Sequence, residues 1–250
     1  MSSWAAMAAV AAWCFVVALI GTSLGLVLGT IRLPILLLVA SSPAAGAGAN
    51  IGVSAVSAAA ASVTHVRNRL VNWRLVAWMA PPSVVGALAG GYFSGLLPAD
   101  VLLVAIGLLL VYFGVRTLLE RRTEAPARPG HLNLRAAVLA SLLIGLLGGL
   151  VGLILGTLRV PAMIRHVGET PHRTVATNLV VGLVLGVAGV IGHLPSGVDW
   201  PLLAVGSAAS IPGGLVGSRL TGRVSERQLL NAIAVALLIV GTATAVRGVV

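Results

Sequence analysis

Residues 28–34 read Leu-Gly-Thr-Ile-Arg-Leu-Pro, and residues 155–161 read Leu-Gly-Thr-Leu-Arg-Val-Pro, 127 positions later. Each copy places an arginine and a helix-breaking proline inside strongly apolar sequence. Arginine stays protonated at any accessible pH, and a charge within a membrane segment costs roughly 2.5 to 3.5 kcal/mol on insertion scales. A cost of this size that occurs twice, in equivalent places, indicates a functional role. We interpret Arg32 and Arg159 as the charge partners of an anion.

The composition around these motifs is that of a membrane protein. Hydrophobic residues make up 58% of the 250 residues, charged residues 9%, and the mean hydropathy is +1.06. The apolar runs are about 20 residues long, which suits transmembrane helices rather than the roughly 10-residue alternating strands of a barrel. We therefore expect an all-α integral membrane protein with about eight transmembrane helices. They are predicted at residues 4–28, 46–64, 73–96, 101–119, 134–155, 174–191, 200–220 and 229–246.

Other motifs repeat at a similar distance and indicate two homologous four-helix repeats. Val-Asn-Trp at residues 71–73 returns as Val-Asp-Trp at residues 198–200, and the segment that opens at Ser83 returns from Ser210. Three further pairs occur at an offset of 128: Pro43 with Pro171, Asn50 with Asn178, and His65 with His193. Glycines four residues apart, such as Gly86 and Gly90, predict close helix contacts within each half.

A polar connection separates the two halves. Residues 120–133 contain three arginines, two glutamates and two prolines, a composition typical of a linker. We expect a first repeat at 1–119, this linker at 120–133, and a second repeat at 134–250. Four spans per half is an even number, so both halves should cross in the same direction, related by a pseudo-twofold axis along the membrane normal. With nine arginines on the face of the termini and five on the other, the positive-inside rule favours cytoplasmic termini.

The first apolar run is longer than one membrane span requires. Residues 4–28 already suffice, yet residues 33–40 continue the apolar sequence. Proline lacks an N–H and disfavours helical geometry in the preceding residue, so we expect helix breaks or gates at Pro34 and Pro161. The segment after Pro34 would fold back as a short re-entrant helix, with Arg32 beside the break. Helix ends at membrane depth present unpaired N–H groups to anions.

No carboxylate within an apolar run can neutralise the two arginines. The six acids lie in or beside connections, at Asp100, Glu120, Glu124, Glu169, Asp199 and Glu226. A guanidinium is a planar fork suited to two-point contact with carboxylate, sulfite, sulfonate or phosphate oxygens. We therefore expect a small anionic substrate to supply the counter-charge. The alternative is an interfacial arginine that snorkels to lipid phosphates.

Further polar residues are candidates for the same pathway. Those predicted to line the anion site are Thr30, Thr157, Asn50 and Asn178, with hydrogen bonding or packing between helices as the alternative. Two histidines close their helices and could serve as a proton-linked gate, or could be solvated at the interface. These are His65 and His193.

Several other functional classes find no support. Cys14 is the one cysteine and no metal-ligand spacing occurs, so we expect neither metal nor cofactor. Residues 21–25 fit the Gly-x-Ser-x-Gly pattern, but they lie inside an apolar helix rather than in a strand-to-helix turn, so we expect no enzyme. Most of the sixteen arginines lie in short connections, which indicates topogenic charge rather than a nucleic-acid surface.

The order and repetition of these motifs resemble the TauE/SafE family of membrane permeases. The resemblance rests on a glycine-containing first helix that leads to a proline, the Val-[Asn/Asp]-Trp motif, and the Ser-x-x-Gly-[Ala/Gly]-Leu motif after it, and it covers nearly the whole chain. It implies outward movement of sulfite, sulfonates or related organic anions across the bacterial inner membrane, with a site framed by the first and fifth helices. The family often carries three glycines before the proline, whereas this chain has Arg32 there, so an organic anion is as good a candidate as sulfite.

These observations predict a secondary transporter that moves a small anion by alternating access. A passive anion channel and a non-transporting membrane partner subunit are the two alternatives. The expected partners are the small anion, membrane lipid and, in a homodimer, a second copy of the chain.

Overall fold

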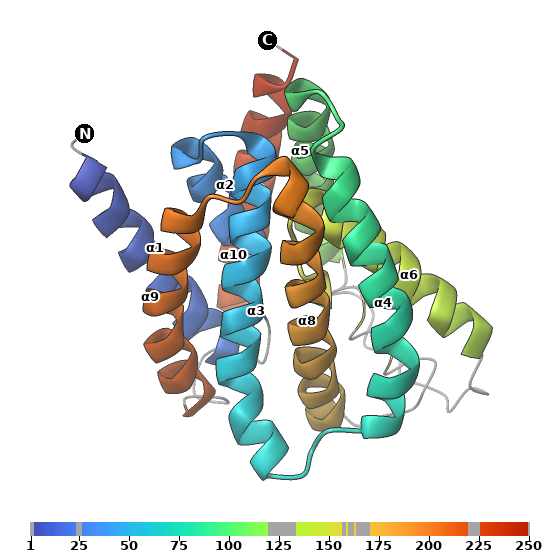
Figure 1. The fold of residues 1–250 in the computed structure, drawn as a ribbon. Helices are drawn as coiled ribbons and strands as arrows, with labels where there is room; N and C mark the ends of the chain where they lie inside the picture. The colour runs from blue at the N-terminus through green and yellow to red at the C-terminus, as the bar shows by residue number, and fades with distance from the viewer. Residues whose placement is uncertain are drawn as a thin grey trace.

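The computed structural model describes residues 3–23, 27–119, 134–156, 159, 163, 171–219 and 226–249, and every regular element in these ranges is helical (Figure 1). The first half contains α1 (Ser3–Ser23), α2 (Gly29–Val39), α3 (Pro43–Arg67), α4 (Trp73–Ser94) and α5 (Ala99–Leu119). The second contains α6 (Leu134–Val151), α8 (Pro171–His193), the short 3₁₀ helix η2 (Leu194–Ser196), α9 (Trp200–Arg219) and α10 (Glu226–Arg247). The predicted linker at 120–133 lies outside the described residues.

Six helices of the described chain are long and apolar enough to cross a membrane, and they lie within α1, α3, α4, α5, α8 and α9. The two other predicted spans coincide with α6 and α10, whose apolar stretches, Val138–Val151 and Leu237–Arg247, are shorter. The additional helix α2 is short and apolar. These are the elements of a multi-pass membrane protein, as predicted.

Helices of the two halves interleave rather than forming two separate bundles. The most extensive contacts join α4 to α6, α1 to α9 and α5 to α10. Glycine makes the close approach possible: a Cβ on Gly86 of α4 would overlap the carbonyl oxygen of Leu142, and one on Gly217 of α9 would overlap that of Leu19. Small residues are the usual means by which helix backbones meet in membranes. The spacing of the glycines predicted close contacts, but these contacts join the two halves instead of lying within one.

Two pairs of corresponding helices, α3 with α8 and α5 with α10, run antiparallel. At one end of the first pair, Gly48 of α3 lies beside His193, the last residue of α8. At the other end, Leu179 near the start of α8 packs against Ala58 and Ala61. An axis along the membrane normal would make corresponding helices parallel, so that prediction is wrong.

The number of crossings explains the error. Gly206 of α9 lies beside Cys14 of α1 and Val53 of α3. Gly214, further along α9, lies beside Thr22 of α1 and Ala60 of α3. Helices α1 and α3 thus cross in the same direction, and the segment between them, which includes α2, brings the chain back. The first half therefore crosses an odd number of times instead of four.

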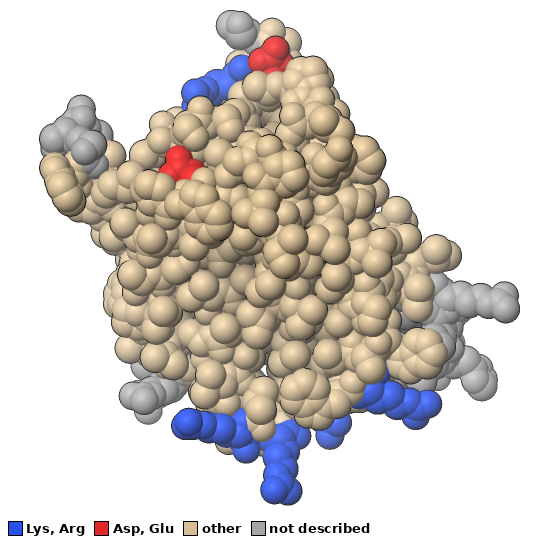
Figure 2. Space-filling model, viewed as in Figure 1, with Lys and Arg blue, Asp and Glu red and all other residues tan. Residues whose placement is uncertain are grey.

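The predicted topology places Arg67, Arg69 and Arg74 on the face of the termini and Arg173 on the other face, but the structure brings them together. The backbone N–H of Asn72, before α4, donates to Thr177 Oγ1 near the start of α8 (2.9 Å). Arg67, Arg69 and Arg74 therefore lie at the same end of the molecule as Arg173. Figure 2 shows basic side chains gathered at that end, and acidic atoms with a further basic patch beside them towards the opposite one.

Candidate anion-binding site at two helix breaks

In the second half, α6 ends in a sharp break at Gly152. This residue has φ +74°, a conformation that favours glycine, and a Cβ there would overlap the carbonyl oxygen of Ala47. The N–H of Leu153 donates to the carbonyl of Gly148 (2.7 Å) and that of Gly152 donates to the carbonyl of Gly149 (3.3 Å). Such a paired arrangement closes a helix. The non-helical residues 153–155 that follow are buried, as irregular backbone at membrane depth must be.

In the first half, the break lies upstream of the residue that was predicted to cause it. Helix α1 ends at Ser23 and α2 begins at Gly29, so Pro34 lies inside α2. Proline there leaves the carbonyl of Thr30 without its helical donor but does not end the helix. A short apolar helix is present as predicted, but it begins at Gly29, so the predicted position of the break is wrong. Pro161 and Thr157 lie outside the described residues.

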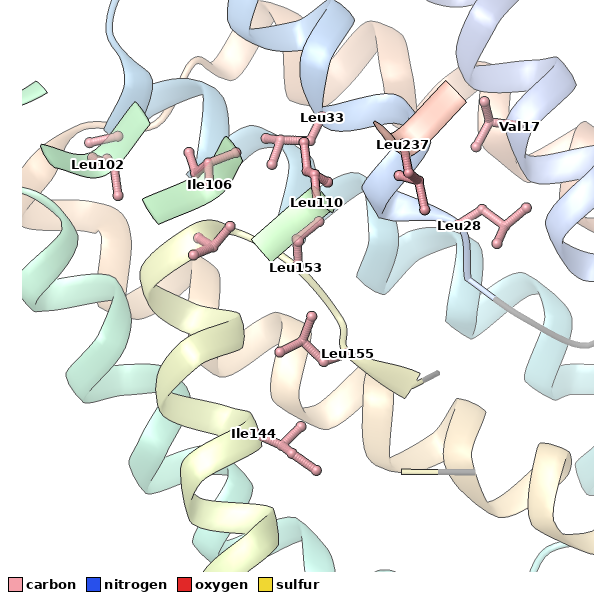
Figure 3. Close-up of a cluster of buried hydrophobic side chains, with 12 residues drawn as sticks. Val17, Leu28, Leu33, Leu102, Ile106, Leu110, Ile144, Leu153, Leu155 and Leu237 are labelled. Atoms are coloured by element: carbon pink, nitrogen blue, oxygen red, sulfur yellow. The ribbon is translucent and has the colours of Figure 1, made fainter. Parts of the chain in front are cut away.

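The two breaks meet in one apolar cluster. Leu28 and Leu33 from the first break pack in the same cluster as Leu153 and Leu155 from the second. Helix α5 contributes Leu102, Ile106 and Leu110 to the same cluster, as Figure 3 shows. The apolar surroundings exclude water and so strengthen any charge interaction nearby.

Arg32 lies in the first turns of α2 and is 1% exposed. Its Nε donates to Oδ1 of Asn50 (3.0 Å), and its Nη2 donates to Oγ of Ser54 and, more weakly, to the carbonyl oxygen of Asn50 (3.5 Å). Both partner side chains come from α3. The guanidinium is therefore held by neutral groups of its own half.

Asn50 joins the two breaks. While its Oδ1 accepts from Arg32, its Nδ2 donates to the carbonyl oxygens of Gly29 (3.2 Å) and Gly152 (2.8 Å). The side chain is completely buried. One amide thus uses its donors and its acceptor to hold the start of α2 and the end of α6. The structure places Asn50 against Arg32, and a contact of Asn50 with an anion stays a prediction.

Arg159 is completely buried but more loosely held. Its Nη1 donates to Oδ1 of Asn178 (3.3 Å) and its Nη2 to Oγ of Ser83 on α4 (3.4 Å). Its Nε has no hydrogen-bond partner among the described residues. The predicted neighbour Asn178 is present, as in the first half, but the bonds are longer.

The two arginines occupy two sites, not one. Ile51 lies opposite Gly189 across the antiparallel α3 and α8 pair. Asn50 is therefore level with about residue 190 of α8 and about 12 residues from Asn178, which is roughly 18 Å of helix. The side chains that bind the two guanidinium groups are all different. The structure does not bring the predicted residues together into a single clamp.

Neither guanidinium has an acidic partner among the described side chains. Asp100 is exposed, and the carboxylate of Asp199 accepts the backbone N–H groups of Ser41 (3.2 Å) and Leu202 (3.3 Å). In the described part of the chain, the hydrogen-bond partners of the two buried positive charges are thus amide, hydroxyl and carbonyl groups. No group of three His, Cys, Asp or Glu side chains in the described residues could hold a metal ion.

Four residues that contact this constellation were not predicted. A Cβ on Gly29 would lie 2.7 Å from Ser54 Oγ, and one on Gly156 would lie 2.5 Å from Asn178 Nδ2. The repetition of these glycines in both motif copies was a usable signal. Ser83 also repeats, as Ser210, whereas Ser54 has Gly182 at the offset of 128, so no repeated signal marked it.

The two histidines lie far apart, because α3 and α8 run antiparallel and each histidine is near the end of its helix. His193 is buried, and its Nε2 donates to the carbonyl of Gly149 in the last turn of α6 (2.7 Å). His65 is partly exposed in the last turn of α3. The structure therefore does not pair them, and a proton-linked role stays a prediction.

Comparison with known proteins matches most of the chain to one protein family. The family model described as "Sulfite exporter TauE/SafE" matches residues 10–244. The chain is 26% identical to the "Probable membrane transporter protein YjnA" of Bacillus subtilis (strain 168), over 91% of this chain and 94% of that protein. It is 25% identical to YtnM of the same organism, also named a probable membrane transporter protein, over 71% and 61% of the two chains. No solved structure matches.

Proposed function

The chain belongs to the sulfite exporter TauE/SafE family and is a membrane transporter, and from this premise we propose that it is a secondary transporter of a small oxyanion. The substrate class is sulfite, a sulfonate or an organic carboxylate. The proposed location is the bacterial inner membrane, with export as the direction.

The observation that carries this proposal is the burial of two arginines without a described acidic partner. An unpaired charge in a low-dielectric interior is strongly unfavourable, and a bound anion removes that cost. Amide and hydroxyl groups hold each guanidinium in place without neutralising it. A membrane protein that keeps two such charges beside helix breaks is suited to recognising an anion at membrane depth.

We propose that the two halves, 1–119 and 134–250, form an inverted repeat and alternate in access. Equivalent hydroxyls support this proposal: Ser83 donates to the carbonyl of Ser141 (3.2 Å), and Ser210 donates to that of Cys14 (3.4 Å). Ser210 lies 127 residues after Ser83, and Ser141 lies 127 residues after Cys14, so donor and acceptor both have their repeat counterpart in the other pair. Inverted repeats with broken helices at the site are a recurrent architecture of secondary transporters.

The orientation follows from the arginine-rich end of the molecule. The positive-inside rule places the end with Arg67, Arg69 and Arg74 in the cytoplasm. Helix α1 begins, and α10 ends, at the other end (Figure 1). We therefore propose that Ser3 and Arg247 lie outside the cytoplasm, in place of the cytoplasmic termini expected from the count of spans.

Proteoliposomes that contain the purified protein test the function. We expect labelled methanesulfonate, sulfite or acetate to enter faster when the same unlabelled anion is inside, because a carrier returns faster when loaded. Replacement of both arginines, R32Q with R159Q, should abolish this exchange in a protein that keeps its helical content. Flux without exchange would indicate a passive channel, and no flux of any of the three anions would indicate a non-transporting subunit.

A further inference from the structure

The two arginines differ in which edge of the guanidinium is occupied. Nε and Nη2 share one edge and point their N–H groups in parallel, the geometry that binds two oxygens of one oxyanion. In Arg32 this edge is filled, because Nε donates to Asn50 and Nη2 donates to Ser54. In Arg159 the same edge has one long bond, from Nη2 to Ser83 (3.4 Å), and Nε has no partner in the described part of the chain.

The sequence accounts for this difference. Ser54, which occupies Nη2 of Arg32, has Gly182 as its counterpart in the second half. Asn178 contacts Nη1 of Arg159, on the other edge of the guanidinium, instead of Nε. The second half therefore supplies no described side chain that fills the Nε and Nη2 edge.

We propose that a single oxyanion binds across the Nε and Nη2 edge of Arg159, next to Ser83, and that Arg32 is a positioning residue that does not touch it. This inference rests on the proposed function and adds which copy of the motif binds. The ligand is an anion with two oxygens on one central atom, such as a carboxylate, a sulfonate or sulfite. A halide cannot use both N–H groups in the same way.

Ser83 completes the site. Its hydroxyl donates to the carbonyl of Ser141 and accepts from Arg159, so the serine lies where the second oxygen of the anion would arrive. When an anion takes over the Nη2 donor, the Ser83 hydroxyl is free to rotate and donate to it. Ser210 donates to the carbonyl of Cys14 in the equivalent place and has no described bond to an arginine.

Matched lysine variants test the proposal in the full-length protein. Lysine keeps the charge but has no two-point edge, so R159K should weaken methanesulfonate binding by at least about tenfold and chloride binding by less than about threefold. R32K should lower the melting temperature but leave both affinities within about threefold. Methanesulfonate and chloride titrations of the purified proteins measure these values.

The serines provide an independent pair. S83A should weaken methanesulfonate binding by about three- to tenfold, whereas S210A should leave it unchanged. Three results would each overturn the assignment to Arg159. R32K and R159K could lose the same methanesulfonate affinity, or R159K could prefer methanesulfonate over chloride as strongly as the wild type does. S83A and S210A could also change the affinity equally. If the wild-type protein exchanges anions but R159K binds them normally, only this inference fails. If the wild-type protein moves none of the anions, the proposed function fails.

Discussion

The two copies of the Leu-Gly-Thr-x-Arg motif contain the same residue types, but their arginines differ in how many hydrogen bonds hold the guanidinium group. In the first copy, Arg32 is bound by Asn50 and Ser54, and Asn50 also ties together both helix breaks. In the second copy, Arg159 has two long bonds and a buried Nε without a described partner. In the first copy the Nε and Nη2 donors of the arginine are both occupied, and in the second copy they are not. Identical residues in two related positions therefore need not share a role.

The largest effect on anion affinity should come from removing the charge of Arg159. R159Q removes two charge-assisted donors of about 1.5 to 3 kcal/mol each, so anion affinity should fall by at least about 100-fold. R32Q should instead reduce stability and leave the affinity of the folded fraction within about tenfold. Calorimetric titration with methanesulfonate measures both variants. Equal affinity losses would remove the distinction between the two copies.

The break after α6 requires glycine both for its positive φ and for the lack of room for a Cβ. Comparison with Gly197, which shares only the positive φ, separates the two effects. Gly152 has positive φ and no room for a Cβ, whereas Gly197 has φ +87° and open space, with no atom within 4 Å, where a Cβ would lie. G152A should cost at least about 3 kcal/mol, and G197A only the backbone strain of about 1 to 2 kcal/mol. Thermal unfolding in detergent compares them. A G152A protein as stable as G197A would contradict the close contact with Ala47.

The two asparagines should differ in their contribution to stability. N50A removes bonds to Arg32, Gly29 and Gly152, whereas N178A removes the bond to Arg159. At about 1 kcal/mol for each bond in a membrane protein, N50A should cost about 3 kcal/mol and N178A about 1 kcal/mol. Unfolding in a denaturing detergent measures the difference. A larger loss in N178A than in N50A would show that the hydrogen bonds of the second copy contribute more to stability.

Replacing the proline within α2 should have the smallest effect. P34A adds an N–H that can donate to the Thr30 carbonyl, so the variant should be at least as stable as the wild type and should transport within about twofold of its rate. Transport assays and thermal unfolding check this. A large loss of transport would show that Pro34 acts as a hinge although α2 continues through it.

The sequence predicted the helical class and singled out Asn50 and Asn178 as polar residues of interest, because apolar run length and repeated polar residues are local signals. It did not predict the direction of the halves. The sequence predicted one span at residues 4–28 and a short re-entrant helix after Pro34, which adds no crossing. Only the tertiary contacts of α1 and α3 with α9 show that the chain returns across the protein between α1 and α3.

The partners of the two arginines were also beyond the sequence. Ser83 reaches Arg159 from α4 of the other half, and Ser54 has no repeated counterpart. Pro34 was a misleading signal, since proline in the middle of α2 removes one helical hydrogen bond without fixing where the helix begins. The glycine before each threonine, at Gly29 and Gly156, was the better indicator, because in each copy it lies against the asparagine.

Nitrogen NMR of the arginine side chains tests the central claim most directly. The Nε–H signals of Arg159 and Arg32 can be assigned by their disappearance in R159K and R32K, and followed while methanesulfonate is added to the wild-type protein. We expect the Arg159 signal to shift in a saturable manner and the Arg32 signal to stay in place. A saturable shift of Arg32 with no change at Arg159 would contradict it.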